Sequence, residues 1–289
     1  MNTTTYSGRL YRSVYRLLLA ASRLGARVPC KTFSTLDQQL RVIQQIYVIN
    51  LDRQVGRWNQ IQREIQQICD VSGTSLTTIA KRFSAVDARY YTECPRDAEL
   101  QTCYSLEDQL FVEPNTLLAS DQVARYRTVL MTRQEIAVAL SHIALWKHIA
   151  SGEHRYALVL EDDVYFRRNF ARILDKAWPE LARSLGTSDG FDVLYLSYKE
   201  AKKVEKREVS NLLFKPLRGL WQLSGYVLSK NGAKRLLSLL PVRGPVDLWI
   251  NRQFERIDVF ATRRSLPKDW IICLTIYTRF YLSSRRLVC

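Results

Sequence analysis

Short apolar runs, each followed by a polar cluster, recur along this chain and predict buried strands that alternate with helices. The first run is 46–51 (Ile-Tyr-Val-Ile-Asn-Leu), and the most apolar one is 157–160 (Ala-Leu-Val-Leu). Continuous apolar runs of this length are typical of strands whose two faces are both covered, as in a parallel sheet. Further runs predict strands at 83–86, 192–196 and 221–228.

The segments between these runs carry signals for helix starts. Thr132 to Glu135 (Thr-Arg-Gln-Glu) is a capping box, so we expect a helix from there to about Ile149. Ser229 is placed to cap a helix over 230–240. Apolar spacing predicts other helices after Trp58 and over 169–185. The alternation of strands and helices indicates an α/β fold with a mostly parallel central sheet flanked by helices.

Two connections lack a clear pattern. Residues 89–130 carry prolines and scattered charge, which predicts a long surface insertion over the active site. Residues 199–215 are rich in lysine and arginine and predict a charged, mobile segment.

The ends of the chain differ from its middle. We expect one domain over 44–262, a basic N-terminal segment over 1–36, and a basic C-terminal tail over 263–289 that packs on the domain. The segment 1–36 contains arginines and leucines but no acid. Three interpretations stay open for it: an amphipathic helix on an anionic membrane surface, an organelle transit peptide, or a poorly ordered basic tail.

The charge of the chain indicates an anionic partner. Its 289 residues include 43 Lys and Arg against 28 Asp and Glu, a net charge of +15. Such a balance suits a nucleotide sugar, an anionic lipid surface, an acidic glycan or nucleic acid. No nucleic-acid-binding motif is present, so nucleic acid is not an expected partner. No apolar run reaches the roughly 18 residues of a membrane span.

The six cysteines form no Cys-x-x-Cys pair, which favours free thiols in a reducing compartment. We therefore expect a cytoplasmic protein that can lie peripherally on the inner face of a membrane.

Three consecutive acids follow the most apolar strand: Glu161, Asp162 and Asp163. Burying three carboxylates side by side is very costly, so they must meet solvent or a cation. Residues two apart in an extended chain share a face, so Glu161 and Asp163 are expected to point one way and Asp162 the other. Carboxylates suit Mn²⁺ or Mg²⁺, ions that combine one or two acids with substrate phosphates. The alternative is a solvated acidic turn that caps the next helix.

Several motifs stand in one order along the chain. They are I-Y-V-I-N-L-D-R, F-S-A-V-D-A, T-R-Q-E-I-A-V-A-L-S-H-I-A-L-W, V-L-E-D-D-V, D-V-L-Y-L-S, S-G-Y-V-L-S-K-N-G-A-K-R-L-L and P-V-D. In this order they resemble glycosyltransferase family 25, over roughly residues 45–260. That family includes bacterial lipopolysaccharide galactosyltransferases and animal collagen galactosyltransferases.

The resemblance implies a GT-A-type nucleotide-sugar-binding fold, a UDP-sugar donor (usually UDP-galactose), a divalent cation and inversion at the anomeric carbon. By position, Glu161 and Asp163 match the metal-binding acid pair. Asp247 matches the acid of the late P-V-D motif, near the acceptor. The positions that match donor-binding or nucleotide-binding residues are Asn50, Leu51, Arg57, Asp87, Glu135, Ser141, His142 and Asp162. The chain departs from the family where Ala137 replaces a common glycine.

Alternatives remain for single residues. Asp247 is our choice for the general base, against acceptor binding or helix capping. Asp87 suits a turn as well as a uridine contact. His142 suits a structural role as well as a donor contact.

For the whole chain, the expectation is a metal-dependent inverting transferase that moves a hexose, most simply galactose, from a UDP-sugar. The expected acceptor is a glycan or glycolipid such as lipopolysaccharide or a surface oligosaccharide. The alternatives are an inactive relative that acts as a glycan-binding or adhesion protein, and a hydroxylysine-type protein galactosyltransferase.

Overall fold

The computed structural model describes residues 30–31, 43–70, 72–115, 126–166, 170–185, 190–263 and 271–273. A six-stranded sheet runs through it in the order β10–β13–β11–β8–β2–β4. The strands are β2 (Gln45–Asn50), β4 (Ala80–Ser84), β8 (Tyr156–Glu161), β10 (Val193–Glu208), β11 (Leu213–Ser229) and β13 (Val259–Thr262). Of the five neighbouring pairs in this order, β4–β2, β2–β8 and β10–β13 are parallel. The predicted α/β fold with a mostly parallel central sheet is confirmed.

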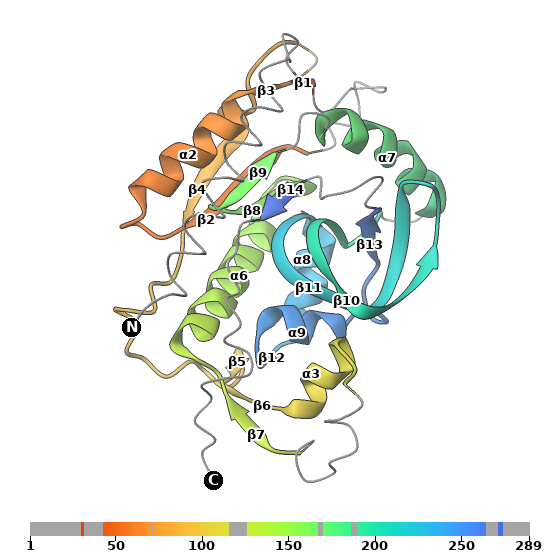
Figure 1. Cartoon of the computed structure of the whole chain (residues 1–289). Helices are drawn as coiled ribbons and strands as arrows, with labels where there is room; N and C mark the ends of the chain where they lie inside the picture. Colours follow the sequence, from red (N-terminus) through yellow and green to blue (C-terminus); the bar gives the residue numbers. More distant parts are fainter. Residues whose placement is uncertain are drawn as a thin grey trace, which may run out of the picture.

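Helices cover both faces of the sheet (Figure 1). The helices are α2 (Val55–Gln66), α6 (Arg133–Ser151), α7 (Phe170–Leu185), α8 (Lys230–Ser238) and α9 (Val246–Asn251). Alternate residues of β8 enter two separate cores. Leu158 and Leu160 pack in the core that includes residues of α2 and α7. Ala157 and Val159 pack in the core that includes residues of α6, α8 and α9.

The caps predicted for two helices are present. Thr132 Oγ1 accepts a hydrogen bond from the Glu135 N–H, and the Glu135 carboxylate accepts one from the Thr132 N–H. Ser229 Oγ accepts from the N–H of Gly232 at 2.8 Å. These caps fix the starts of α6 and α8, the two helices that pack against each other beside the sheet.

The segment 89–130 is more ordered than its composition predicts. It contains β5 (Leu100–Gln101), β6 (Cys103–Ser105), α3 (Leu106–Val112) and β7 (Thr128–Leu130). Leu100, Tyr104 and Val112 are almost fully buried, at 1%, 2% and 0% exposure. The prediction of an irregular surface insertion was therefore wrong for these parts, because a few anchoring residues at irregular spacing give no periodic signal.

The charged segment 199–215 is a continuation of β10 and the start of β11, which pair antiparallel. Ion pairs hold it together: Lys206 lies 3.5 Å from Glu200, and Arg218 pairs with Glu205. The expectation of a mobile segment was wrong here, because backbone pairing of the two strands and the cross-strand ion pair of Glu205 with Arg218 replace the apolar pattern outside the core. The strand predicted at 83–86 also lies earlier, at Ala80–Ser84.

The end segments are described only in part. Strand β1 (Cys30–Lys31) pairs with β3 (Ile68–Cys69), and β14 (Ile271–Cys273) pairs with β9 (Val164–Phe166). Apart from Cys30–Lys31, the basic segment 1–36, for which three interpretations stay open, lies outside the described residues, as does most of the tail over 263–289. Among the helices that the structure describes, none has the length and apolarity to cross a membrane.

Replacing two glycines by alanine is expected to change the free energy of unfolding in opposite directions. A Cβ at Gly232 in α8 lies 2.4 Å from the Asp192 carbonyl oxygen, and a Cβ at Gly56 in α2 meets nothing within 4 Å. We expect Gly232→Ala to lower the free energy of unfolding by about 1–3 kcal/mol, because backbone must shift. Gly56→Ala should raise it by about 0.5–1 kcal/mol. Urea denaturation measures both, and shifts of the same sign would contradict the packing described for α8.

Candidate functional site

A cleft of about 410 Å³ lies where β2, β4 and β8 end. These three strands are parallel, so their carboxyl ends meet at one edge of the sheet. Open α/β sheets bind ligands at this edge, and the volume suits a small molecule. The cleft brings together these residues predicted from the sequence: Leu51, Arg57, Asp87, Ser141, His142, Glu161, Asp162 and Asp163.

The acidic turn after β8 is anchored by its middle residue. Asp162 is 7% exposed; its Oδ2 accepts from Asn50 Nδ2 at 2.7 Å, and its Oδ1 pairs with Arg57 Nη1 at 3.0 Å. Burial lowers the pKa of Arg57, but the charge and hydrogen bond of Asp162, together with the charges of Asp163 and Glu161, outweigh this and raise it. Asn50 therefore does not line the cleft itself; it holds Asp162, which ties the loop after β2 to the acidic turn.

The backbone leaves the strand conformation directly after Glu161. Strand β8 ends at Glu161, and Asp162 and Asp163 form a turn, so all three residues line the cleft. Asp162 is buried against Asn50 and Arg57, whereas Glu161 and Asp163 are more exposed, so the middle acid differs from the outer two as the sequence predicts.

The acid pair fits part of a metal site. Among the described residues, no group of three or more His, Cys, Asp and Glu side chains is arranged to hold a metal ion. Mg²⁺ and Mn²⁺ in nucleotide sites use one or two carboxylates and complete their shell with phosphates and water. Glu161 and Asp163 border the same cleft, so they fit such a partial site.

Arginines line the same cleft. Arg53 Nε lies 2.5 Å from Asp87 Oδ2, and the N–H of Arg89 donates to Asp87 Oδ1 at 3.0 Å. The hydrogen bond from Arg53 is the main cause that lowers the pKa of Asp87. Asp87 is therefore a turn former and a cleft residue at once. Arg53 and Arg89 were not assigned from the sequence, because nothing in the pattern distinguishes them from the many other arginines.

Ser141 and Glu135 make structural contacts. Ser141 is 3% exposed, accepts from the Val86 N–H at 2.9 Å, and donates to the Ala137 carbonyl at 2.6 Å. It thereby joins α6 to the loop after β4. Glu135 is engaged in the capping box and borders a second pocket outside the main cleft.

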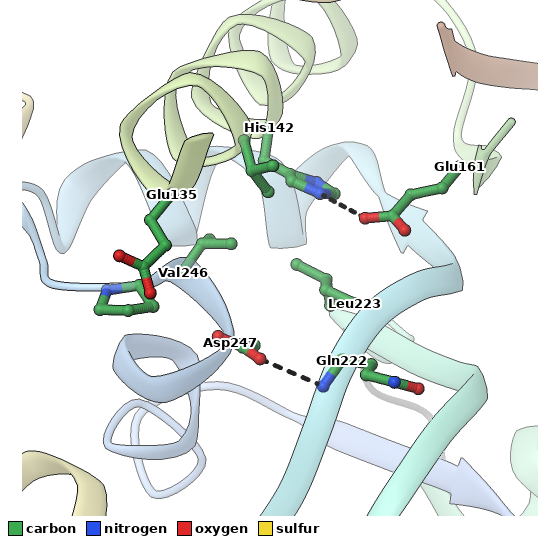
Figure 2. A pocket seen from close by; sticks show the side chains of 9 residues that line it. Glu135, His142, Glu161, Gln222, Leu223, Val246 and Asp247 are labelled. Carbon is green, nitrogen blue, oxygen red and sulfur yellow. Dashed lines mark hydrogen bonds and ion pairs between the residues drawn. The ribbon is translucent and has the colours of Figure 1, made fainter. Parts of the chain in front are cut away.

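This second pocket contains Asp247 (Figure 2). His142, Glu161 and Val138 border both the pocket and the cleft, so the two spaces are adjacent. Burial raises the pKa of Asp247 to about 6, and the negative charges of Glu135 and Glu161 add to this. A carboxyl group with such a pKa can exchange a proton near neutral pH.

Comparison with known proteins now identifies the family. The family model described as "Glycosyltransferase family 25 (LPS biosynthesis protein)" matches residues 43–250. This chain belongs to glycosyltransferase family 25. The matched range runs from the start of β2 into α9, so it includes both the cleft and Asp247.

Relatives in family 25 are distant and longer. A "Glycosyltransferase 25 family member" of Aedes aegypti is 29% identical over 223 residues, 74% of this chain and 31% of the relative. One of Drosophila melanogaster is 27% identical over 252 residues, 83% of this chain and 36% of the relative. The mouse protein described as "Inactive glycosyltransferase 25 family member 3" is 31% identical over 130 residues, 44% of this chain and 21% of the relative. The chain thus spans about a third of the length of these insect proteins.

Membership in family 25 implies a GT-A-like fold, which the sheet and its helices match, and a nucleotide-sugar donor.

Two residues missed by the sequence analysis of this family 25 chain hold Asp247 in place. Asn251 Oδ1 accepts from the N–H groups of Gly219 and Leu220, and its Nδ2 donates to the carbonyls of Leu220 and Asp247. This clamps α9 to β11. Gln222 adopts a left-handed φ of 71° and directs its N–H at the Asp247 carboxylate, at 3.4 Å. Strained backbone of this kind concentrates at functional sites.

The raised pKa of Asp247 gives a stability prediction. Its folded-state pKa of about 6 exceeds the ordinary 3.8, so the folded protein holds a proton that the unfolded chain releases between pH 4 and 6. Stability therefore falls as pH rises through this window, by roughly 3 kcal/mol. Urea denaturation from pH 4 to 7 measures it, with Asp247→Asn as the control that lacks the group. Parallel curves for the two proteins would contradict the raised pKa.

Proposed function

We propose that this chain is a metal-dependent inverting glycosyltransferase that moves a hexose, most simply galactose, from a UDP-sugar to a hydroxyl of a glycan acceptor. A lipopolysaccharide or surface oligosaccharide is the acceptor class we favour. One observation carries the proposal: a cleft with arginines and an acidic turn adjoins a pocket whose buried carboxyl has a pKa of about 6.

The cleft suits the donor. Arg53, Arg57 and Arg89 offer positive charge to a diphosphate, and Glu161 and Asp163 would hold Mn²⁺ or Mg²⁺. When bound, the cation supplies positive charge that stabilises the departing diphosphate. The arginines bind and orient the phosphates, and Asp162 keeps Arg57 in place for this.

The second pocket suits the proton transfer. An inverting reaction needs a base opposite the leaving group, within reach of the acceptor hydroxyl. The ionised carboxylate of Asp247 accepts this proton. The Gln222 N–H, which donates to the carboxylate, and Asn251, which donates to the backbone carbonyl of Asp247, hold the residue in orientation. Glu135 and Glu161 add negative potential that makes the carboxylate a stronger base.

The names of some relatives favour a second candidate. The mouse protein is described as inactive, so an inactive chain that binds glycans stays the alternative. Release of UDP from a UDP-sugar in the presence of Mn²⁺ separates the two functions, and a panel of UDP-sugars identifies the donor.

We expect Glu161→Gln and Asp163→Asn each to reduce the rate of UDP release about a hundred-fold or more. Removing one group that stabilises charge in a transition state typically lowers the rate by this factor. The control is Asp97→Asn, an exposed acid that borders neither the cleft nor the Asp247 pocket. Circular dichroism checks that each variant is folded. Full activity in both cleft variants would contradict the metal assignment.

Asp247→Asn should lower kcat by about 10²–10⁴-fold, because the proton loses its acceptor. In the wild-type protein, kcat/KM should fall tenfold per pH unit below about pH 6, where Asp247 becomes protonated. The residual rate of Asp247→Asn should lack this dependence. The measurement is transfer to a glycan acceptor between pH 4.5 and 8, and a wild-type profile that stays flat down to pH 5 would exclude Asp247 as the base.

A further inference from the structure

Three buried aromatic side chains form a hydrogen-bonded chain behind the cleft. Trp146 Nε1 donates to Tyr226 Oη at 3.0 Å, and His142 Nδ1 lies 2.9 Å from the same oxygen. His142 is 1% exposed, and Trp146 and Tyr226 are fully buried. Trp146 and His142 come from α6, and Tyr226 comes from near the carboxyl end of β11.

The protons of these three hydrogen-bonded side chains have one consistent arrangement. An indole N–H can only donate, so Trp146 occupies a lone pair of Tyr226 Oη. The hydroxyl keeps one proton to donate, and in the described part of the chain its other contact is His142 Nδ1. Leaving a buried hydroxyl proton unshared is costly. His142 Nδ1 therefore accepts this proton and carries none of its own, so the ring proton lies on Nε2.

Tyr226 is suited to remain the donor. Burial raises the pKa of its hydroxyl well above the ordinary value, and the charge of Glu161 raises it further. The phenol is therefore protonated over the whole working range of pH.

The other edge of the imidazole faces the acidic turn. His142 Nε2 lies 3.9 Å from Glu161 Oε1, beyond hydrogen-bond range but close enough for attraction (Figure 2). With the proton on Nε2, an N–H points at this carboxylate. With the other tautomer, a nitrogen lone pair faces the negative oxygen and repels it.

We propose that Trp146 and Tyr226 are positioning residues that fix His142 as the Nε2–H tautomer, and that this N–H orients the Glu161 carboxylate between the donor cleft and the Asp247 pocket. The proposal rests on the proposed function, because the orientation of Glu161 matters only where Glu161 binds the cation. In this role His142 orients Glu161, which differs from both a donor contact and simple core packing.

The test is ¹⁵N NMR of the metal-free protein. The chain has only three histidines, His142, His148 and His154, so His148→Gln and His154→Gln assign the signals. We expect His142 to show a protonated Nε2 and an unprotonated Nδ1 in the wild type. The reverse tautomer would overturn the proposal without any variant.

Tyr226→Phe removes the hydroxyl that fixes the ring, so the Nδ1–H tautomer of His142 should become populated. The matched control is Tyr198→Phe, which removes a buried hydroxyl that donates to the Thr262 carbonyl at 2.5 Å and leaves the histidine untouched. An unchanged tautomer in Tyr226→Phe would overturn the proposal.

The second readout is the affinity for Mn²⁺ in the presence of UDP, followed by water proton relaxation. Loss of a residue that orients a ligand typically weakens metal binding by about 10–100-fold, so Tyr226→Phe should do so and Tyr198→Phe should not. A changed tautomer with unchanged Mn²⁺ affinity would overturn the orienting role. Wild-type protein with the Nε2–H tautomer but without transferase activity would refute the proposed function and leave the tautomer assignment standing.

Discussion

The site depends on one buried carboxylate. Asp162 cannot lie at 7% exposure without partners, and Asn50 and Arg57 supply them from the end of β2 and the first turn of α2. Because Asn50 ends β2 and Arg57 lies in the helix that follows it, this interaction ties the end of β2 to the acidic turn after the parallel strand β8. The neighbouring Glu161 and Asp163 thereby border the cleft, where their carboxylates are available to a ligand. Truncating Asp162 would leave the Arg57 guanidinium and the Asn50 amide without this partner at the same time.

The structure separates two kinds of chemistry. The cleft is rich in charge and carries arginines and acids together, which suits an anionic donor with a cation. The second pocket is smaller and contains a carboxyl that burial has made basic. Glu161 and His142 border both spaces. In the proposed reaction, the charge of this shared border would influence donor binding and proton transfer together.

The sequence predicted the parts of the fold in which local pattern and tertiary environment agree. The apolar run before Glu161 became β8, and the Thr132 capping box starts α6, because burial on both faces and helix capping leave direct marks on residue order. The outer part of the hairpin formed by β10 and β11, over 199–215, was missed, because charged strand residues such as Glu205, which pairs with Arg218 across the hairpin, look like loop composition. The partners that bury Asp162 were also missed, since Asn50 and Arg57 lie far from it in the sequence.

The site was predicted as a set of residues but not as a set of contacts. Ser141 and Glu135 accept hydrogen bonds from backbone N–H groups. Asn50 donates to Asp162. The spacing of residues along the sequence reveals none of these contacts. Gln222 and Asn251 act on Asp247 through contacts between β11 and α9 that exist only in the folded chain. The most direct test of the account is anomalous diffraction from crystals grown with Mn²⁺ and UDP. It should show manganese bonded to carboxylate oxygens of Glu161 and Asp163, with the diphosphate beside Arg57. Manganese and UDP bound away from this cleft would contradict the account.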